Sequence, residues 1–170
     1  ITLQDDAYLE AQGRACSGEY AGYGVVCDGD IVVNGNAALK ATAQDVAVCT
    51  SSNLEVSGGK LIAKSTGSNG VYAGGAISIS NAEAEVSGFY PALYADSNVT
   101  VEDSSLIATS TGRAAIYSEN GMIALTNSMV DIDGADGYYG IYASGGVNVS
   151  GSWVETTGPE SLDNVLSRIE

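Results

Sequence analysis

The chain has 170 residues with 21 acidic and 6 basic side chains, which gives it a formal net charge of -15. Nucleic acid and acidic membrane surfaces are therefore excluded as main partners, because affinity for phosphates depends on clustered Lys and Arg. The absence of histidine excludes Ser-His-Asp and Cys-His catalysis and ordinary zinc enzymology, and no apolar run approaches the roughly 20 residues of a membrane-spanning helix.

Short apolar-x-apolar triplets recur about every 23 residues and predict a repeat of three short strands. The first triplet of each repeat starts at Ile31, Leu54, Ile77, Val99, Ile123 and Val147. The second follows seven or eight residues later, at Leu39, Leu61, Ala84, Leu106, Val130 and Val154. The third precedes the next repeat by six or seven residues, at Val25, Val48, Val71, Leu93, Ile116 and Ile141.

Residues that tolerate a left-handed backbone stand four positions after the start of each first strand. They are Asp5, Gly35, Gly58, Asn81, Asp103, Asn127 and Gly151. Because all seven equivalent positions carry Gly, Asn or Asp, we expect the same tight turn in every repeat. Asp5 extends the pattern back to a strand that begins at Ile1.

Strands this short cannot enclose a core within one repeat, so the repeats must stack and pair each strand in parallel with its equivalent, about 4.8 Å away. The sequence therefore predicts an all-β fold, a right-handed parallel β-helix of about seven coils over residues 1–158. A leucine-rich repeat would need a Leu/Asn consensus and a helical return, which are missing. Small residues in one inward column agree with a narrow core: Ala73, Ala95, Ser118 and Ala143.

The two ends depart from the repeat. Residues 1–30 form an atypical first coil with about seven extra residues around 16–22, which we interpret as a cap or loop. Residues 159–170 are predicted to form a short C-terminal capping helix, with a linker as the alternative. The apolar residues of this tail are spaced as on one face of a helix: Leu162, Val165, Leu166 and Ile169.

Three cysteines leave their pairing open. In the repeat register, Cys27 lies in the small inward column and Cys49 points outward. A bridge from Cys16 to Cys49 fits this register, and a bridge from Cys16 to Cys27 requires the first coil to slip by one residue. Three free thiols are the remaining alternative.

Tyrosine occupies the outward middle position of the third strand in four successive coils, at Tyr72, Tyr94, Tyr117 and Tyr142. We call these four residues the tyrosine ladder. One interpretation is packing, because equivalent aromatic side chains one rung apart stack on each other. The other is a ligand-binding strip for sugars, walled by nearby loop aromatics. These loop residues are Phe89, Tyr90, Tyr138 and Tyr139.

Two pairs of carboxylates also fall into register, Asp96 with Glu119 and Asp131 with Glu155. Like charges one rung apart repel unless they are solvated, protonated or bridged by a cation, and calcium prefers oxygen ligands of this kind. The four residues are therefore candidate metal ligands, with a solvated acidic face as the alternative. On the same outward face as Glu155, Trp153 lies beside the second strand of the last coil.

The coil texture of residues 115–121 (Ala-Ile-Tyr-Ser-Glu-Asn-Gly) and 140–158 (Gly-Ile-Tyr-Ala-Ser-Gly-Gly-Val-Asn-Val-Ser-Gly-Ser-Trp-Val-Glu-Thr-Thr-Gly) resembles that of bacterial surface β-helix proteins. In particular, the chain resembles a carbohydrate-binding, pectate-lyase-like but non-catalytic β-helix family of anaerobic Firmicutes. This resemblance covers roughly residues 25–158. It implies a secreted or wall-displayed module, and some relatives bind acidic plant polysaccharide together with calcium.

From these observations we expect an extracellular, non-enzymatic bacterial module that binds carbohydrate, with calcium as a bridging ion if the glycan is acidic. The alternative is a structural or adhesive spacer in a surface protein. A polysaccharide lyase or esterase is a third candidate on fold analogy alone. The short loops argue against it, because they cannot build a deep cleft around Arg14, Arg113 or Arg168.

Overall fold

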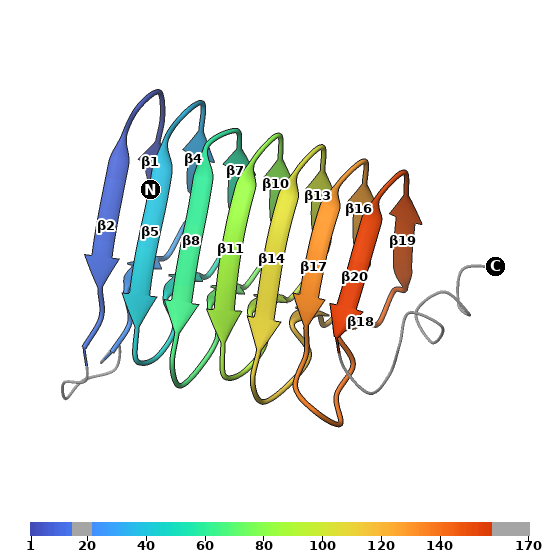
Figure 1. The fold of residues 1–170 in the computed structure, drawn as a ribbon. Helices are drawn as coiled ribbons and strands as arrows, with labels where there is room; N and C mark the ends of the chain where they lie inside the picture. The colour runs from blue at the N-terminus through green and yellow to red at the C-terminus, as the bar shows by residue number, and fades with distance from the viewer. Residues whose placement is uncertain (15–21, 158–170) are drawn as a thin grey trace.

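The computed structural model describes residues 1–14 and 22–157 and confirms the parallel β-helix (Figure 1). Three parallel sheets run the length of the molecule, and each takes one strand from every coil. The chain rises along the first sheet, crosses over and descends along the second while it advances toward the C-terminus, so the coil is right-handed. Six three-strand coils are followed by the first two strands of a seventh.

The first sheet contains seven short strands, in the order in which the coils stack. They are β1 (Thr2–Leu3), β4 (Ile31–Asn34), β7 (Leu54–Ser57), β10 (Ile77–Ser80), β13 (Val99–Glu102), β16 (Ile123–Thr126) and β19 (Val147–Ser150). The second sheet has the longest strands. They are β2 (Tyr8–Gln12), β5 (Ala38–Ala43), β8 (Lys60–Ser65), β11 (Glu83–Gly88), β14 (Ser105–Ser110), β17 (Met129–Asp133) and β20 (Trp153–Thr157).

The third sheet contains six strands of three residues each. They are β3 (Val25–Cys27), β6 (Val48–Thr50), β9 (Val71–Ala73), β12 (Leu93–Ala95), β15 (Ile116–Ser118) and β18 (Ile141–Ala143). The pairing register confirms the predicted columns in all three sheets. Ile77 pairs with Val99, for example, and Ala84 pairs with Leu106.

All seven predicted turn positions have a positive φ, between 47° at Asp103 and 77° at Gly58. These turns join the first sheet to the second. A β-carbon at Gly58 would lie 2.6 Å from the carbonyl oxygen of Gly35 in the preceding coil, so this coil accepts only glycine without rearrangement. Four of the other positions carry Asp or Asn, residue types that tolerate the left-handed backbone better than most: Asp5, Asn81, Asp103 and Asn127.

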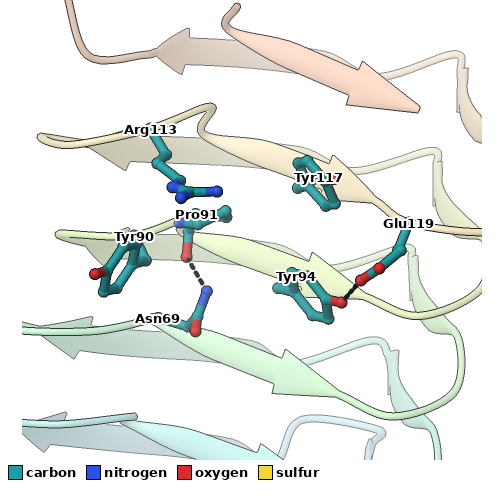
Figure 2. Close-up of a pocket in the computed structure, with 7 residues that line it drawn as sticks. All are labelled: Asn69, Tyr90, Pro91, Tyr94, Arg113, Tyr117 and Glu119. Carbon is teal, nitrogen blue, oxygen red and sulfur yellow. Dashed lines mark hydrogen bonds between the residues drawn. The ribbon is translucent and has the colours of Figure 1, made fainter. Parts of the chain in front are cut away.

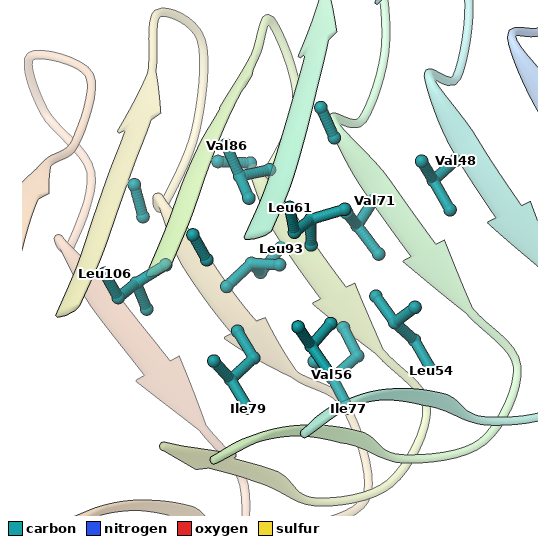
Figure 3. Packing of buried hydrophobic residues seen from close by; sticks show 14 of the residues in the cluster. Val48, Leu54, Val56, Leu61, Val71, Ile77, Ile79, Val86, Leu93 and Leu106 are labelled. Carbon is teal, nitrogen blue, oxygen red and sulfur yellow. The ribbon is translucent and has the colours of Figure 1, made fainter. Parts of the chain in front are cut away.

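The core is a single column of aliphatic side chains that point inward from all three sheets (Figure 3). Leu54, Ile77 and Leu93 meet there from two sheets, and each is at most 1% exposed. Inward serines in the turn before the second sheet are bonded across coils. The Ser128 hydroxyl accepts the Ser104 amide at 3.2 Å, and the Ser152 hydroxyl accepts the Ser128 amide at 3.0 Å. No buried side-chain polar atom in the described part of the chain lacks a partner.

Several predictions fall outside the described residues, namely the inserted loop, Cys16 and the capping helix. Within residues 1–14 and 22–157, Cys27 and Cys49 both carry free thiols. Cys27 packs against the core and Cys49 occupies an outward position, as the register predicts. None of the described segments forms a helix long and apolar enough to cross a membrane.

Candidate functional site

The tyrosine ladder is formed as predicted, on the outward side of the third sheet. The ring centroids are 5.0 Å apart for Tyr72 and Tyr94, 5.5 Å for Tyr94 and Tyr117, and 4.8 Å for Tyr117 and Tyr142. Neighbouring ring planes differ by only 6°, 6° and 18°. This regularity follows from the strand register, because Tyr94 pairs directly with Tyr72 and Tyr117 in the flanking strands.

Stacking limits how the ladder can contact a ligand. The two inner rings, Tyr94 and Tyr117, each have another tyrosine against both faces. Sugars pack on the faces of aromatic rings, and those faces are covered along most of the ladder. The ring edges and hydroxyl groups remain available, together with the terminal face of Tyr142, which is 38% exposed at the edge of the sheet.

A shallow groove of about 450 Å³ lies beside the middle of the ladder (Figure 2). One side is formed by Tyr94, Tyr117 and the strand end at Glu119. The other side is formed by the turns that precede the strands of the third sheet. These turns contribute Asn69, Tyr90, Pro91 and Arg113. Since successive coils supply these turns, the groove follows the long axis of the solenoid.

Polar side chains on both sides of the groove are held in place by contacts within the protein. The Tyr94 hydroxyl donates a hydrogen bond to the Glu119 carboxylate, and the Asn69 amide donates to the carbonyl oxygen of Pro91 at 3.1 Å. The Arg113 guanidinium lies over the Tyr90 ring, with its Cζ 5.5 Å from the ring centroid. Such a cation–π contact orients the guanidinium while its donors stay free for a ligand.

Arg113 differs from the lysines of the described chain. Lys40, Lys60 and Lys64 each pair with a glutamate, whereas no ion pair forms to Arg113 within residues 1–14 and 22–157. Arg113 does lie next to the segment that contains Asp136, since its carbonyl oxygen accepts the Ala135 amide at 3.1 Å. A cation that has no acidic partner in a strongly acidic protein is well placed to bind an anionic or hydroxyl-rich ligand.

Electrostatics around the ladder oppose ionisation of its first tyrosine. Burial raises the pKa of the Tyr72 hydroxyl, and the charges of Asp96, Cys49 and Glu119 raise it further. Burial likewise raises the pKa of the neighbouring Cys49 thiol, with a smaller contribution from Asp45. The Tyr72 hydroxyl therefore stays neutral at physiological pH and can both donate and accept hydrogen bonds.

The carboxylate pairs occupy two separate places. Asp131 pairs in register with Glu155 on the outward side of the second sheet. Asp96 and Glu119 follow neighbouring strands of the third sheet, near the ladder. In the described part of the chain, no group of three or more His, Cys, Asp or Glu side chains is arranged to hold a metal ion. Each pair would supply only part of the six to eight oxygen ligands of calcium.

The sequence identified the aromatic half of this groove but not its polar half. Tyr90 was predicted to wall a sugar-binding strip, for which the ladder tyrosines were the candidate binding residues, with packing as the alternative. Asn69, Pro91 and Arg113 were not placed together, although they occupy the same turn in three successive coils. Aligning the turns before the third strands as carefully as the strands themselves would have revealed this column.

In comparisons with known proteins, no family model, no curated protein and no solved structure matches the chain. The fold agrees with the resemblance to β-helix proteins in the sequence. The carbohydrate ligand, the secretion and the bacterial origin that this resemblance implies stay predictions.

Proposed function

We propose that the protein is a non-catalytic, carbohydrate-binding β-helix that is secreted or displayed on a bacterial surface. The observation that carries this proposal is the axial groove, where aromatic side chains, an arginine and a fixed carboxylate converge on one open surface. A parallel β-helix is consistent with a carbohydrate-binding or adhesive module. The shallow groove, open to solvent, suits reversible binding of a polymer better than chemistry in a water-excluded site.

The ligand would be a linear glycan that runs along the solenoid axis. The rungs repeat every 4.8 to 5.5 Å along the ladder, a spacing comparable with the rise of an extended glycan per sugar. Hydroxyl groups of the ladder would bond the sugars on one side, and Tyr90 and Arg113 would contact them on the other. A chain in this position meets a ladder tyrosine at each of four successive coils, so affinity should rise with oligosaccharide length.

Arg113 would favour a glycan that carries acidic sugars, by pairing directly with a carboxylate. The remaining charge of the protein opposes such a ligand, and calcium that bridges the glycan to Asp96 and Glu119, which lie near the ladder, would relieve that repulsion. A neutral glycan would need neither arginine nor calcium. The charge of the ligand and its dependence on calcium are therefore the properties to measure first.

The test is a glycan array with and without millimolar calcium, followed by calorimetry on the best oligosaccharide. For an acidic glycan, Arg113→Ala should weaken binding at least about tenfold, because a charge-assisted hydrogen bond contributes roughly 1.5–3 kcal/mol. Arg14→Ala is the matched control, since Arg14 is an exposed arginine at the end of β2 that bonds only Gln12 in the described chain. Absence of binding to every glycan in both conditions would contradict the proposal.

A structural or adhesive spacer is the second candidate, and the stacking of the ladder favours it. Rings that cover one another contribute to stability whether or not a ligand is present. In a spacer, the four tyrosines would act only as packing, and the groove would have no ligand. Variants that lose stability without losing any binding activity would support this candidate.

A further inference from the structure

The outward side of the second sheet has two dissimilar halves. Over β2, β5, β8 and β11, each lysine forms an ion pair with a glutamate of the neighbouring coil. The pairs are Lys40 with Glu10 at 2.8 Å, Lys60 with Glu83 at 3.1 Å, and Lys64 with Glu85 at 2.5 Å. The negative charge of this half is therefore neutralised within the protein itself.

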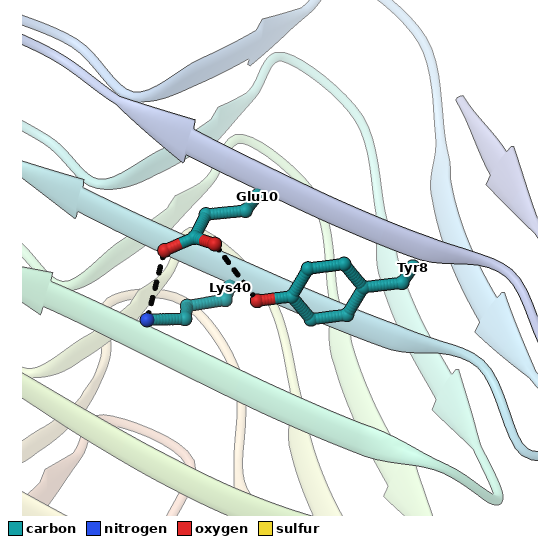
Figure 4. A network of polar contacts seen from close by, with 3 residues as sticks. All are labelled: Tyr8, Glu10 and Lys40. Atoms are coloured by element: carbon teal, nitrogen blue, oxygen red, sulfur yellow. Dashed lines mark hydrogen bonds and ion pairs between the residues drawn. The ribbon is translucent and has the colours of Figure 1, made fainter.

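Figure 4 shows how complete this neutralisation is at the first coil. The Glu10 carboxylate accepts hydrogen bonds from the Lys40 ammonium and from the Tyr8 hydroxyl, the latter at 3.0 Å. These two bonds, the lysine bond first, hold the pKa of Glu10 below its usual value. The exposed carboxylate has its bonding groups supplied by its own strand, through Tyr8, and by the neighbouring strand β5, through Lys40, and needs no external partner.

Over β14, β17 and β20 the same side is apolar and acidic. Ile107, Met129 and Trp153 are 45%, 60% and 57% exposed, and Met129 pairs in register with Trp153. Asp131 lies between Ile107 and Glu155 in the next column. We call these five residues the acidic-apolar patch. Its three strands contain no lysine or arginine.

The carboxylates of the first half each have a lysine partner, whereas the carboxylates of the patch have none in the described chain. Within residues 1–14 and 22–157, no Lys or Arg forms an ion pair with Asp131 or Glu155. Two like charges one rung apart repel each other. A basic group supplied from outside would relieve this repulsion, just as Lys40 and Lys64 do for the first half.

We propose that the acidic-apolar patch is a docking surface for a protein segment that presents apolar side chains together with lysine or arginine. Exposed aliphatic and aromatic side chains side by side are typical of protein interfaces, and large patches of this kind rarely stay uncovered. Carboxylates beside them favour a basic partner and disfavour an acidic one.

Other occupants fit the patch less well. A glycan would bind to aromatic faces and neutral polar groups, whereas two of the three apolar residues here are Met129 and Ile107. A second copy of this chain would bring another acidic surface with an overall charge of -15. The basic apolar segment is the one occupant that satisfies both the apolar and the charged parts. This surface is separate from the axial groove, so the proposal does not depend on glycan binding.

The single tryptophan of the chain lies in the patch and provides the measurement. The probe is a synthetic peptide of alternating Leu and Lys, with a Leu–Glu peptide of equal length as the control. With the full chain, the Leu–Lys peptide should shift the Trp153 emission to the blue in a saturable, salt-sensitive manner, and the Leu–Glu peptide should not.

Two charge variants separate docking from general attraction to an acidic protein. Asp131→Asn/Glu155→Gln should weaken the Leu–Lys interaction about threefold to tenfold, because two exposed ion pairs are lost. Glu83→Gln/Glu85→Gln removes the same charge from the first half and should leave the affinity unchanged. Met129→Ser/Ile107→Ser should also weaken binding while the reporter stays in place.

Four results would overturn the proposal. Equal weakening by both charge variants would mean non-specific attraction, and an unresponsive emission would mean that the patch binds no such segment. A blue shift that grows with protein concentration alone would assign the patch to a second copy. Emission that is already blue in the free chain and moves to the red in a chain ending at Gly158 would assign it to residues 159–170.

Discussion

The central and the terminal coils carry the same strand pattern but bury it to different extents. In the inward column formed by the second residue of each strand in the second sheet, Leu39, Leu61 and Leu106 are at most 1% exposed. The equivalents at the two ends, Leu9 and Val154, are only partly buried. The difference arises because a coil buries its side chains against both neighbours, and an end coil has a described neighbour on one side only.

Stability in the molecule is therefore a nearest-neighbour property. Each central residue gains burial from the coil before it and the coil after it, so the same substitution should cost more in the middle than at an end. Outward residues do not take part in this burial and can vary from coil to coil. The stability cost of a substitution should therefore differ between inward and outward positions, and between central and terminal coils.

The largest effect should come from placing a charge inside a central coil. Leu106 is fully buried, whereas Ile107, the next residue on the same strand, is 45% exposed. Leu106→Asp should unfold the protein, because a buried carboxylate without a partner costs several kcal/mol. Ile107→Asp should lower the melting temperature far less, because the new carboxylate stays in water even though it lies between Glu85 and Asp131. Circular dichroism can follow both variants. Equal damage from the two variants would contradict the register.

The same change at the centre and at the end should differ in cost. Leu61→Ala should reduce the free energy of unfolding by about 2–5 kcal/mol, because it removes buried atoms and leaves a cavity between two coils. Leu9→Ala in the first coil should cost only about 1–2 kcal/mol, since Leu9 is only partly buried and no closed cavity forms. Urea denaturation measures both values. A cost at Leu9 equal to that at Leu61 would show that the first coil is covered as completely as the centre.

The tyrosine ladder should give a smaller loss from outside the core. Tyr94→Ala/Tyr117→Ala removes three stacked contacts, each of which contributes about 0.5–1.5 kcal/mol. Tyr138→Ala, in the loop before β18, is the control for losing one exposed ring. If the ladder also binds a glycan, the double variant should lose this binding while it stays folded. A folded double variant that binds its glycan like the parent would leave the ladder with a packing role only.

The sequence predicted the inside of this protein far better than its outside. The strand columns, the seven left-handed turns and the orientation of Cys27 and Cys49 were all predictable, because the repeat imposes the same backbone on every coil and an error in register would bury polar groups. The alignment of the four tyrosines followed from the same register.

The candidate site was only half predictable for a physical reason. The groove depends on how far the Arg113 and Tyr90 side chains extend from turns that vary in length, and no periodicity governs such directions. The stacking of the ladder rings was one of two open interpretations, since both packing and binding place tyrosine at the same outward position. The contrast between the two halves of the second sheet also needed the structure, because the pairing of Lys64 with Glu85 is diagonal and not between register partners.

The smallest predicted effect is a pH dependence confined to the first coil. In the turn before the first sheet, the central coils use an amide: the side-chain oxygens of Asn53 and Asn98 accept backbone amides of the next coil at 2.9 and 3.0 Å. The first coil has Asp30 in this role. Its carboxylate accepts hydrogen bonds from the Ser52 hydroxyl and from the backbone and side-chain amides of Asn53, the latter two at 3.0 Å.

These bonds, the Ser52 bond first, lower the pKa of Asp30 in the folded protein. A carboxyl whose pKa is lower in the folded state stabilises that state above its unfolded pKa of about 3.9, and this contribution is lost as the pH falls through the lower folded value. Melting temperatures measured between pH 7 and pH 2 should therefore fall less steeply below about pH 4 for Asp30→Asn than for the parent. Asp28→Asn removes one charge from the same turn and is the control for a change in net charge alone. A slope for Asp30→Asn equal to that of the parent would contradict this prediction. It would mean that the contact between the first and second coils does not depend on pH.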